Sequence, residues 1–341
     1  MYNFKNDYSE GAHPNILNRL IETNLVQQLG YGDDEYATQA KEILKKKINN
    51  PLATIHFLSG GTQTNLIVIS FLLRPHEAVI SAKTGHIAAN ETGAIEATGH
   101  KVITVETTDG KLNPAAIEKA LQEYALKPHV VKPRMVYISN STEIGTIYLK
   151  EELEDLAACC LANNLLLFLD GARLGHALMA QDNDLTLADV ARLTDVFYIG
   201  GTKNGALLGE AVIFRAPHLA EDFEYVLKQR GAMLAKGRVL AIQFFELFKE
   251  DLYFELADHA NKMAMKIATT VRSKGFSFLT NSTTNQIFPI LPKDTIKKLN
   301  EHYLFFVWKE IDEDHAAIRL ITSWATDEQY VDAFITDLKR L

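Results

Sequence analysis

Residues 165–173 read LLLFLDGAR, in which five apolar residues lead directly into Asp170 and Arg173 follows three positions later. An unbroken apolar run of this length is typical of a strand that helices cover on both faces. Asp170 should therefore lie at the carboxyl end of a buried strand, the place where open α/β sheets bind ligands. A carboxylate buried there is unfavourable unless a cation meets it.

Two other segments, TIHFLSGGT ending at Thr62 and DVFYIGGTK ending at Lys203, place a glycine pair directly after a strand-like run. In the first, Gly60, Gly61 and Thr62 open a helix whose free N–H groups can bind a phosphate. In the second, Lys203 is held at the sheet edge beside other charged groups. Desolvation and cationic neighbours there favour the neutral amine that bonds to an aldehyde.

An anion cradle, a carboxylate, a guanidinium and a lysine at one sheet edge are the groups needed to bind pyridoxal 5'-phosphate (PLP). Asp170 can pair with a protonated pyridine nitrogen, and Arg173 can reach a phenolic oxygen or a substrate carboxylate. Each segment alone has a simpler interpretation: a capped helix start, an Asp170–Arg173 ion pair, or a solvated Lys203. The combination of all three predicts a PLP enzyme that acts on amino acids.

Two further residues are candidates for the same site. His86 follows the strand-like residues 78–81 and could stack on a flat cofactor ring, although a turn histidine is nearly as good an interpretation. Arg319 lies in the late apolar run AAIRLIT, where it could bind an incoming α-carboxylate or a structural acid. No His, Cys or Asp cluster has metal-ligand spacing, so no metal site is expected.

The order of elements predicts an α/β fold with a mainly parallel sheet and a smaller second unit. Strand-like runs cover residues 54–59, 78–81, 101–105, 135–138, 165–169, 195–199 and 210–214, with helix-like residues at 62–73 and 151–164. After about residue 220 come helix-like stretches at 220–249 and 252–273, then strand-like runs at 276–279, 286–291, 305–307 and 317–321, and a closing helix at 326–341. The second sheet should be mostly antiparallel. We predict an N-terminal arm (1–14), a large cofactor-binding domain (15–245) and a small C-terminal α+β domain (246–341).

The composition excludes several classes of partner. The 341 residues are 47% hydrophobic and 23% charged, and 35 Lys and Arg against 43 Asp and Glu give a net charge of −8. This balance argues against nucleic acid or an anionic membrane as the main partner. Cys159 and Cys160 are adjacent in a helix-like stretch, so a disulfide framework is not expected. Without a leader-like opening or an apolar stretch of about 18 residues, we expect a cytoplasmic protein with a small-molecule substrate.

On these motifs, the chain resembles the low-specificity L-threonine aldolases, within the β-eliminating lyase group of fold-type I PLP enzymes. The matching pieces run in the family's order along essentially the whole chain: Asn6-Asp7, Tyr31-Gly-Asp-Asp34, Ser59-Gly-Gly-Thr62, His86, Asn90-Glu-Thr-Gly-Ala94, Leu169-Asp-Gly-Ala-Arg173, Gly201-Thr-Lys203 and Arg319. The resemblance implies a PLP-binding large domain, a small C-terminal domain and a homodimer or homotetramer.

The resemblance also implies a role for each site residue. Lys203 would bond covalently to the cofactor, Asp170 would pair with the pyridine nitrogen and His86 would stack on the ring. The phosphate would be covered by Gly60, Gly61 and Thr62, and the substrate carboxylate would be gripped by Arg173 and Arg319. The expected reaction is cleavage of the Cα–Cβ bond of a β-hydroxy-α-amino acid such as L-threonine to glycine and an aldehyde. Alternatives are β-elimination, racemisation or transamination of another amino acid, or a PLP-fold protein without catalysis.

Three departures from the family pattern affect the substrate side of the site. The family's opening Ser-Asp-Thr reads Asn6-Asp7-Tyr8, and its Gly-Gly-x-Met-Arg-Gln stretch becomes Gly231-Ala-Met-Leu-Ala-Lys236. Many members have Glu-Asn-Thr-His before a glycine, where this chain has Asn140-Ser-Thr-Glu143-Ile-Gly145. The histidine that meets the β-hydroxyl is therefore absent, and Glu143, His86 or a phosphate-bound water could take its place as the base.

Overall fold

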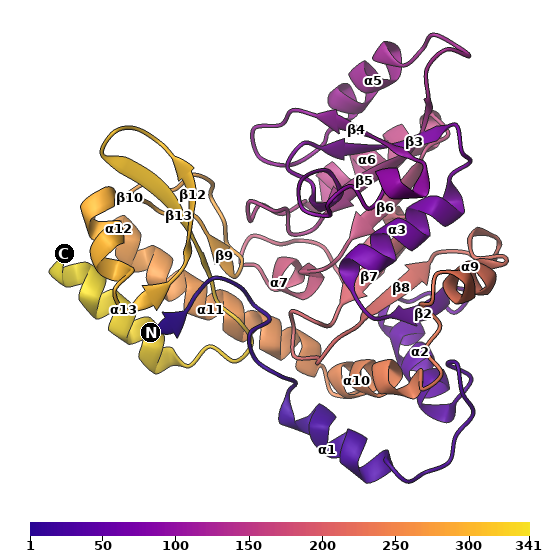
Figure 1. Cartoon of the computed structure of the whole chain (residues 1–341), viewed down its shortest axis with the longest axis horizontal. Coiled ribbons are helices and arrows are strands. Elements are labelled where there is room, and N and C mark those ends of the chain that lie inside the picture. Colours follow the sequence, from indigo (N-terminus) through magenta and orange to yellow (C-terminus); the bar gives the residue numbers. More distant parts are fainter.

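Seven strands form the central sheet of the larger unit in this computed structural model, which describes residues 1–341 (Figure 1). In spatial order they are β2 (Thr54–Leu58), β8 (Glu210–Phe214), β7 (Val196–Gly200), β6 (Leu166–Asp170), β5 (Lys132–Ser139), β3 (Glu77–Ala82) and β4 (Lys101–Val105). Only β8 runs antiparallel to its neighbours, and the other pairs are parallel. The expected α/β class and mainly parallel sheet are confirmed.

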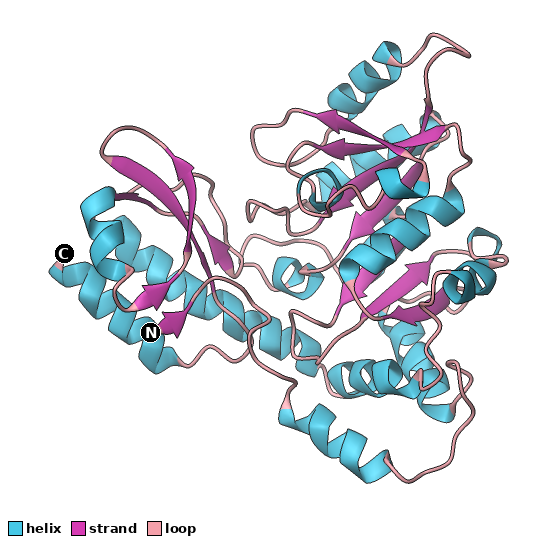
Figure 2. Cartoon of the chain, viewed as in Figure 1, coloured by secondary structure: helices cyan, strands magenta, loops and turns pink.

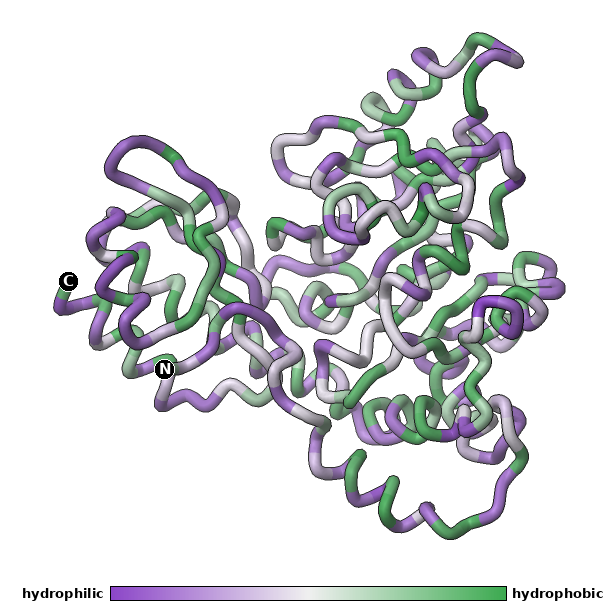
Figure 3. The backbone as a smooth tube through the Cα atoms, viewed as in Figure 1, coloured by the Kyte–Doolittle hydropathy of each residue, from purple (hydrophilic) through white to green (hydrophobic).

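Helices cover both faces of this sheet (Figure 2). One face packs against α2 (Glu35–Lys47), α5 (Pro114–Glu123), α6 (Lys150–Ala162), α8 (Leu187–Leu193) and α10 (Arg238–Lys249). The other packs against α3 (Gly61–Leu72), α4 (His86–Ala89) and α9 (Phe223–Gln229). Successive residues alternate between the two cores, as Tyr198 and Ile199 do on β7. The apolar strands are therefore enclosed, and Figure 3 shows their hydrophobic residues gathered inside the larger unit.

The smaller unit is built on an antiparallel sheet. Its strands are β9 (Gln286–Ile287), β10 (Ile290–Pro292), β12 (Phe306–Glu310) and β13 (His315–Ile321), and it includes α12 (Lys293–Leu299) and α13 (Glu328–Arg340). β13 pairs antiparallel with each of the other three strands. The chain's first strand, β1 (Tyr2–Asn3), pairs in parallel with β11 (Tyr303–Leu304), and Phe4 is buried in this unit's core. The first residues of the chain thus pack in the smaller unit, far from their sequence neighbours.

One long helix, α11 (Leu252–Ser273), joins the two units (Figure 1). Its 22 residues span about 33 Å. Leu256, near its start, belongs to the core of the larger unit, whereas Met263, two turns later, belongs to the core of the smaller one. The helix therefore contributes to the cores of both units. The domain boundary near residue 245 stays a prediction.

Several sequence-based expectations after residue 220 were wrong in detail. The helix-like stretch 220–249 is two helices, because Gly231 adopts a left-handed φ of 69° and ends the first of them. Residues 276–279 form only one isolated bridge, at Phe278, instead of a strand. The helix α12 was not predicted. None of the helices is long and apolar enough to span a lipid bilayer.

The parallel strands place the segments that carry the candidate site residues at one edge of the sheet. β6 ends at Asp170 itself, β7 leads into the Lys203 loop, and β2 leads into the glycine pair before α3. β3 leads to His86 and β5 to Glu143. This edge is where a candidate site should be sought.

Candidate active site

Two adjoining cavities open at the carboxyl edge of the large sheet. The first, of about 320 Å³, is lined by the glycine pair and by Thr62, Asp170, Lys203 and Glu210. The second, of about 410 Å³, is lined by Arg173, Arg319, Phe306 and Trp308. Tyr8, His86, Glu143 and Lys203 line both cavities. Lys203 and Asp170 therefore face the same space, as the proposed pairing across one cofactor requires.

Asp170 is an ionised carboxylate without a lysine or arginine partner. It is 3% exposed, and it forms no ion pair with either residue type. Its Oδ1 accepts a hydrogen bond from the Ala172 amide at 2.9 Å, and its Oδ2 accepts from Asn65 Nδ2 at 3.2 Å and from the Tyr137 hydroxyl. Burial alone would raise the pKa of Asp170, but the charge of His86 and the hydrogen bond from Tyr137 lower it. Its negative charge is available to a cationic ligand atom.

His86 is oriented by a buried acid. Its Nδ1 lies 2.7 Å from Glu91 Oε1, and the same oxygen accepts from Asn65 Nδ2 at 2.7 Å. Burial would lower the pKa of His86, but the hydrogen bond with Glu91 and the charge of Glu143 raise it. Asn65 thereby links His86 and Asp170 through one chain of hydrogen bonds that runs by way of Glu91. This chain fixes the position of the imidazole relative to the carboxylate.

The anion cradle lies at the start of a twelve-residue helix. Gly60 is the N-cap of α3 and makes no side-chain capping bond, and Gly61 and Thr62 follow as the first helical residues. The first amides of a helix have no partner inside it, so these N–H groups face the cavity with the positive end of the helix dipole. A Cβ on Gly61 would lie 3.1 Å from the Tyr198 hydroxyl, which leaves little room for a side chain.

The two arginines of the second cavity, Arg173 and Arg319, differ in their partners. Arg173 binds Asp7 in two places, Nε to Oδ2 at 2.7 Å and a terminal nitrogen to Oδ1 at 3.0 Å, and both side chains are buried. The simpler interpretation, an Asp170–Arg173 ion pair, is therefore wrong. Arg173 lines the second cavity but not the first, so its expected contact with the cofactor gains no support here.

Arg319 has no acidic partner. Its guanidinium lies 4.8 Å from the centre of the Trp308 ring and 5.3 Å from that of Phe306, while its buried Nε donates to nothing. Burial and the nearby charge of Arg173 lower the pKa of Arg319. A partly buried cation with an unused, buried donor on a cavity wall suits a carboxylate ligand.

Some residues of the site were missed by sequence reasoning. Asn65, Glu91 and Tyr137 hold the charged groups in place, and none of them was assigned a role from the sequence. Asp7 lay in a quoted motif without an assigned role. Glu210 did carry a signal in the sequence, because this carboxylate opens the apolar run EAVIF. Like Asp170, it would be buried in a strand, where a carboxylate needs a partner.

These residues fit PLP. The first cavity has a lysine free of ion pairs, an ionised buried carboxylate without a basic side chain paired to it, and a helix start built from glycines. Those are the partners that an aldehyde, a protonated ring nitrogen and a phosphate need.

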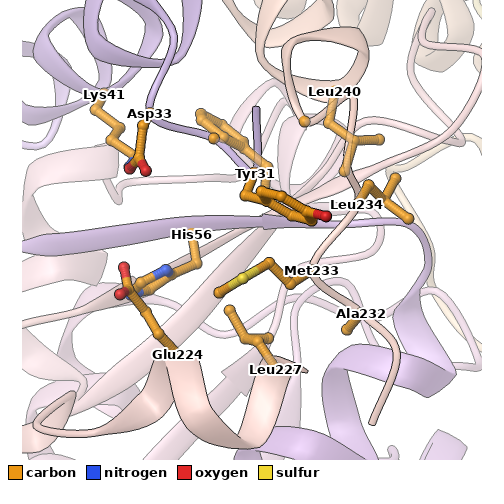
Figure 4. Close-up of a pocket in the computed structure, with 13 residues that line it drawn as sticks. Tyr31, Asp33, Lys41, His56, Glu224, Leu227, Ala232, Met233, Leu234 and Leu240 are labelled. Atoms are coloured by element: carbon orange, nitrogen blue, oxygen red, sulfur yellow. The ribbon is translucent and has the colours of Figure 1, made fainter. Parts of the chain in front are cut away.

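A third, small cavity is separate from this site (Figure 4). Its volume is about 50 Å³, and its walls include Tyr31, His56, Met233 and Leu234. Burial lowers the pKa of His56 to about 4, so the imidazole is neutral. None of the predicted site residues lines it, and it carries no part of the chemistry considered below.

Comparison with known proteins identifies the family. The profile described as "Beta-eliminating lyase" matches residues 12–293. A low specificity L-threonine aldolase of Pseudomonas aeruginosa is 32% identical, over 98% of this chain and 96% of that protein. A solved structure of Leishmania major threonine aldolase is 49% identical, covers 100% of this chain and 99% of that one, and has a TM-score of 0.98. Thermus thermophilus aspartate aminotransferase, at 14% identity and a TM-score of 0.73 over 99% of this chain and 95% of that one, shares the fold alone. The resemblance seen in the motifs is thus confirmed: the chain belongs to the β-eliminating lyase family and has the fold of the fold-type I enzymes.

Proposed function

We propose that this protein is a PLP-dependent aldolase that cleaves the Cα–Cβ bond of a β-hydroxy-α-amino acid of the L-threonine type, giving glycine and an aldehyde. The observation that carries the proposal is that Lys203 and Asp170 line one cavity, next to a second one in which Arg319 has no acidic partner. The names of the relatives, all threonine aldolases, support the same reaction.

The first cavity would hold the cofactor. Lys203 would bond to its aldehyde, Asp170 would pair with the ring nitrogen, and the start of α3 would bind its phosphate. His86, which lines both cavities, would stack on the ring. When bound, PLP supplies an electron sink for the pair released from Cα.

The second cavity would hold the substrate. Arg319 has a free donor and would bind the α-carboxylate, which fixes the orientation of the bonds at Cα. Arg173 would add positive charge to this cavity while its fork stays on Asp7. The carboxylate would then lie in a cavity that two guanidinium groups line, and this orientation would select the bond to be broken.

Of the three bases considered, we favour Glu143 for the β-hydroxyl. Its side chain lines both cavities and forms no ion pair or hydrogen bond, so its carboxylate is free to take a proton. His86 is bound to Glu91 and its pKa is raised, which favours the protonated form. Glu143 would accept the hydroxyl proton as the Cα–Cβ bond breaks and the β-carbon leaves as an aldehyde. Lys203 lines the same two cavities as Glu143 and would pass the proton that Glu143 has taken up to Cα.

Self-association is also part of the proposal. Helix α1 (Pro14–Thr23) and the segment after it expose several apolar side chains: Leu17, Ile21, Leu25, Val26 and Leu29. Ile21 is 75% exposed and Leu25 92%. Several exposed apolar side chains within one short segment suit a second copy of the chain, as in a homodimer or homotetramer. Two buried cysteines without a disulfide are consistent with the cytoplasmic location that we propose.

The test compares Lys203→Ala with Lys83→Ala, an exposed lysine at the end of β3. Lys203→Ala should lose the visible absorbance band of bound PLP and all turnover, whereas Lys83→Ala should keep both. The products of L-threonine and L-allo-threonine should be glycine and acetaldehyde. Ammonia with an oxo acid would indicate elimination instead, and a chain that stays colourless with PLP would contradict the proposal altogether.

A further inference from the structure

The side chain of Arg319 has few contacts that fix its orientation in the second cavity. Its single hydrogen bond is a long one, 3.5 Å from a terminal nitrogen to the Lys5 carbonyl oxygen, and its Nε has no acceptor. The nearby charge of Arg173 repels it, which contributes to the lowered pKa of Arg319. A long, flexible side chain loses rotamer entropy when it is held still, so other contacts have to stabilise the guanidinium.

Two aromatic rings of β12 supply these contacts. The guanidinium carbon of Arg319 lies over the ring of Trp308, 4.8 Å from its centre, and over the ring of Phe306, 5.3 Å from its centre. The face of an aromatic ring attracts a cation, and tryptophan attracts it most strongly. Phe306 is 44% exposed and also lies under the Lys5 ammonium, at 5.2 Å, whereas Trp308 is half-buried and faces Arg319 alone. Trp308 is therefore the main support of the guanidinium.

A β-bulge sets the direction of the Trp308 side chain. Val307 pairs with Ile318, and the next pair in the ladder is Lys309 with Ala317. Trp308 therefore has no partner on β13. An extra residue of this kind bends the strand and re-aims a side chain.

A buried ring in turn holds the indole of Trp308. Phe288 is fully buried, and its ring meets that of Trp308 edge to face, with the ring centres 5.4 Å apart and the planes at 64°. Such edge-to-face pairs add to the stabilisation that burial gives. The indole is thus a fixed surface for the guanidinium of Arg319 to contact.

An aromatic support leaves the charge of Arg319 unpaired. Asp7 shows the alternative, because it accepts two hydrogen bonds from Arg173 and offsets the charge of that guanidinium. An indole face attracts a guanidinium without accepting the N–H groups at its edge. Arg319 therefore keeps its charge, and most of its terminal N–H groups, for a carboxylate in the cavity that Arg319 and Trp308 both line.

We propose that Trp308 is a positioning residue of the substrate cavity, which holds the guanidinium of Arg319 in place for the α-carboxylate and leaves its charge unpaired. This inference rests on the proposed function, in which Arg319 binds that carboxylate. It has two consequences. The effect of Trp308 on substrate binding passes through Arg319, and it is confined to ligands that carry a carboxylate.

The first experiment compares glycine with methylamine, which is glycine without its carboxylate. Their dissociation constants are measured from the change in visible absorbance of the PLP-loaded protein. Trp308→Leu should bind glycine about 5-fold more weakly than the wild type and bind methylamine equally well, because only the carboxylate needs the guanidinium. Trp308→Phe keeps an aromatic face and should bind glycine within about 2-fold of the wild type.

Trp324→Leu is the matched control, because Trp324 is the other tryptophan of the chain, is also half-buried and lines neither cavity. It should bind both amines as the wild type does. If Trp308→Leu loses affinity for glycine and methylamine equally, or for neither, the inference is overturned.

The second experiment is a double-mutant cycle on KM for L-threonine. Trp308→Leu should raise KM about 5-fold in the wild-type background and cause no further rise in the Arg319→Met background. A rise of the same size in both backgrounds would show that Trp308 acts on the substrate directly, and would refute the positioning role.

The two proposals fail in different ways. If Arg319→Met weakens glycine binding and Trp308→Leu does not, only the role of Trp308 is contradicted. If Arg319→Met binds glycine as the wild type does, the substrate site of the proposed function is contradicted as well.

Discussion

Replacing Asp7 by asparagine should destabilise the protein markedly, because it leaves a buried guanidinium without its counter-charge. Asp7 is fully buried and Arg173 is 7% exposed, and two hydrogen bonds of 2.7 and 3.0 Å join them. Burial alone would raise the pKa of Asp7, but the attraction of Arg173 and Lys203 lowers it, so the carboxylate is ionised in the folded chain. Asn285 also donates to it at 2.9 Å.

The magnitude follows from the geometry. Removing one partner of a buried ion pair costs about 3–5 kcal/mol, and asparagine keeps one acceptor for Arg173, so we expect about 3 kcal/mol. For a chain of 341 residues the entropy of unfolding is about 0.7 kcal/mol/K. The expected decrease in Tm is therefore about 4 °C.

Differential scanning calorimetry at pH 7.5 would measure this decrease, with Asp182→Asn as the control because Asp182 is exposed. A double variant, Asp7→Asn with Arg173→Met, removes both charges and should be less destabilised than the sum of the two single variants. A Tm for Asp7→Asn within 1 °C of the wild type, or strictly additive effects, would refute the reasoning. The Asp7 contribution should also be lost in acid: the unfolded carboxyl takes up a proton near pH 4 while the folded one stays ionised, so wild-type stability should fall below about pH 5.

Two other changes test the substrate cavity and the exposed helix. Arg319→Met should raise KM for L-threonine at least 30-fold, because the loss of a charged hydrogen bond to the carboxylate costs about 2–5 kcal/mol. The control, Arg192→Met, replaces an exposed arginine and should leave KM unchanged. Equal KM values in the two variants would exclude Arg319 from substrate binding. Ile21→Asp should shift the sedimentation coefficient towards that of the monomer. Leu161→Asp, at a site on α6 that is 84% exposed, should cause no such shift. Identical sedimentation coefficients for the two variants would show that α1 is not at the interface.

The strand ends of the larger unit could be predicted because each depends on a short, local pattern. An apolar run followed by Gly-Gly or Asp-Gly marks a strand and its end, and β2, β6 and β7 were predicted in this way to within one residue. Residues 101–105 and 210–214 were predicted to the residue from their β-like runs alone. In the smaller unit the strands are short and interrupted. The run at residues 286–291 became two strands that pair with different parts of β13, which depends on tertiary packing.

The site was predictable to the extent that each residue stood at a strand end. Lys203 and Asp170 share a cavity because parallel strands β6 and β7 are neighbours. The Asp7–Arg173 pair was not predictable, since 166 residues separate its members and no local pattern links them. Arg319 was named as a candidate from the sequence, but its position over Trp308 was not predictable, because it depends on the register between β12 and β13.

The two units joined by α11 carry different groups of the proposed site, and this has a consequence for substrate choice. Lys203 and the Gly60–Thr62 cradle belong to the larger unit, whereas Arg319, Trp308 and Phe306 are carried by the smaller one. A substitution on the hairpin of β12 and β13 should therefore alter which amino acid fits without disturbing any group that we propose to hold the coenzyme. Engineering of a new specificity should begin on that hairpin, which lines the proposed substrate cavity.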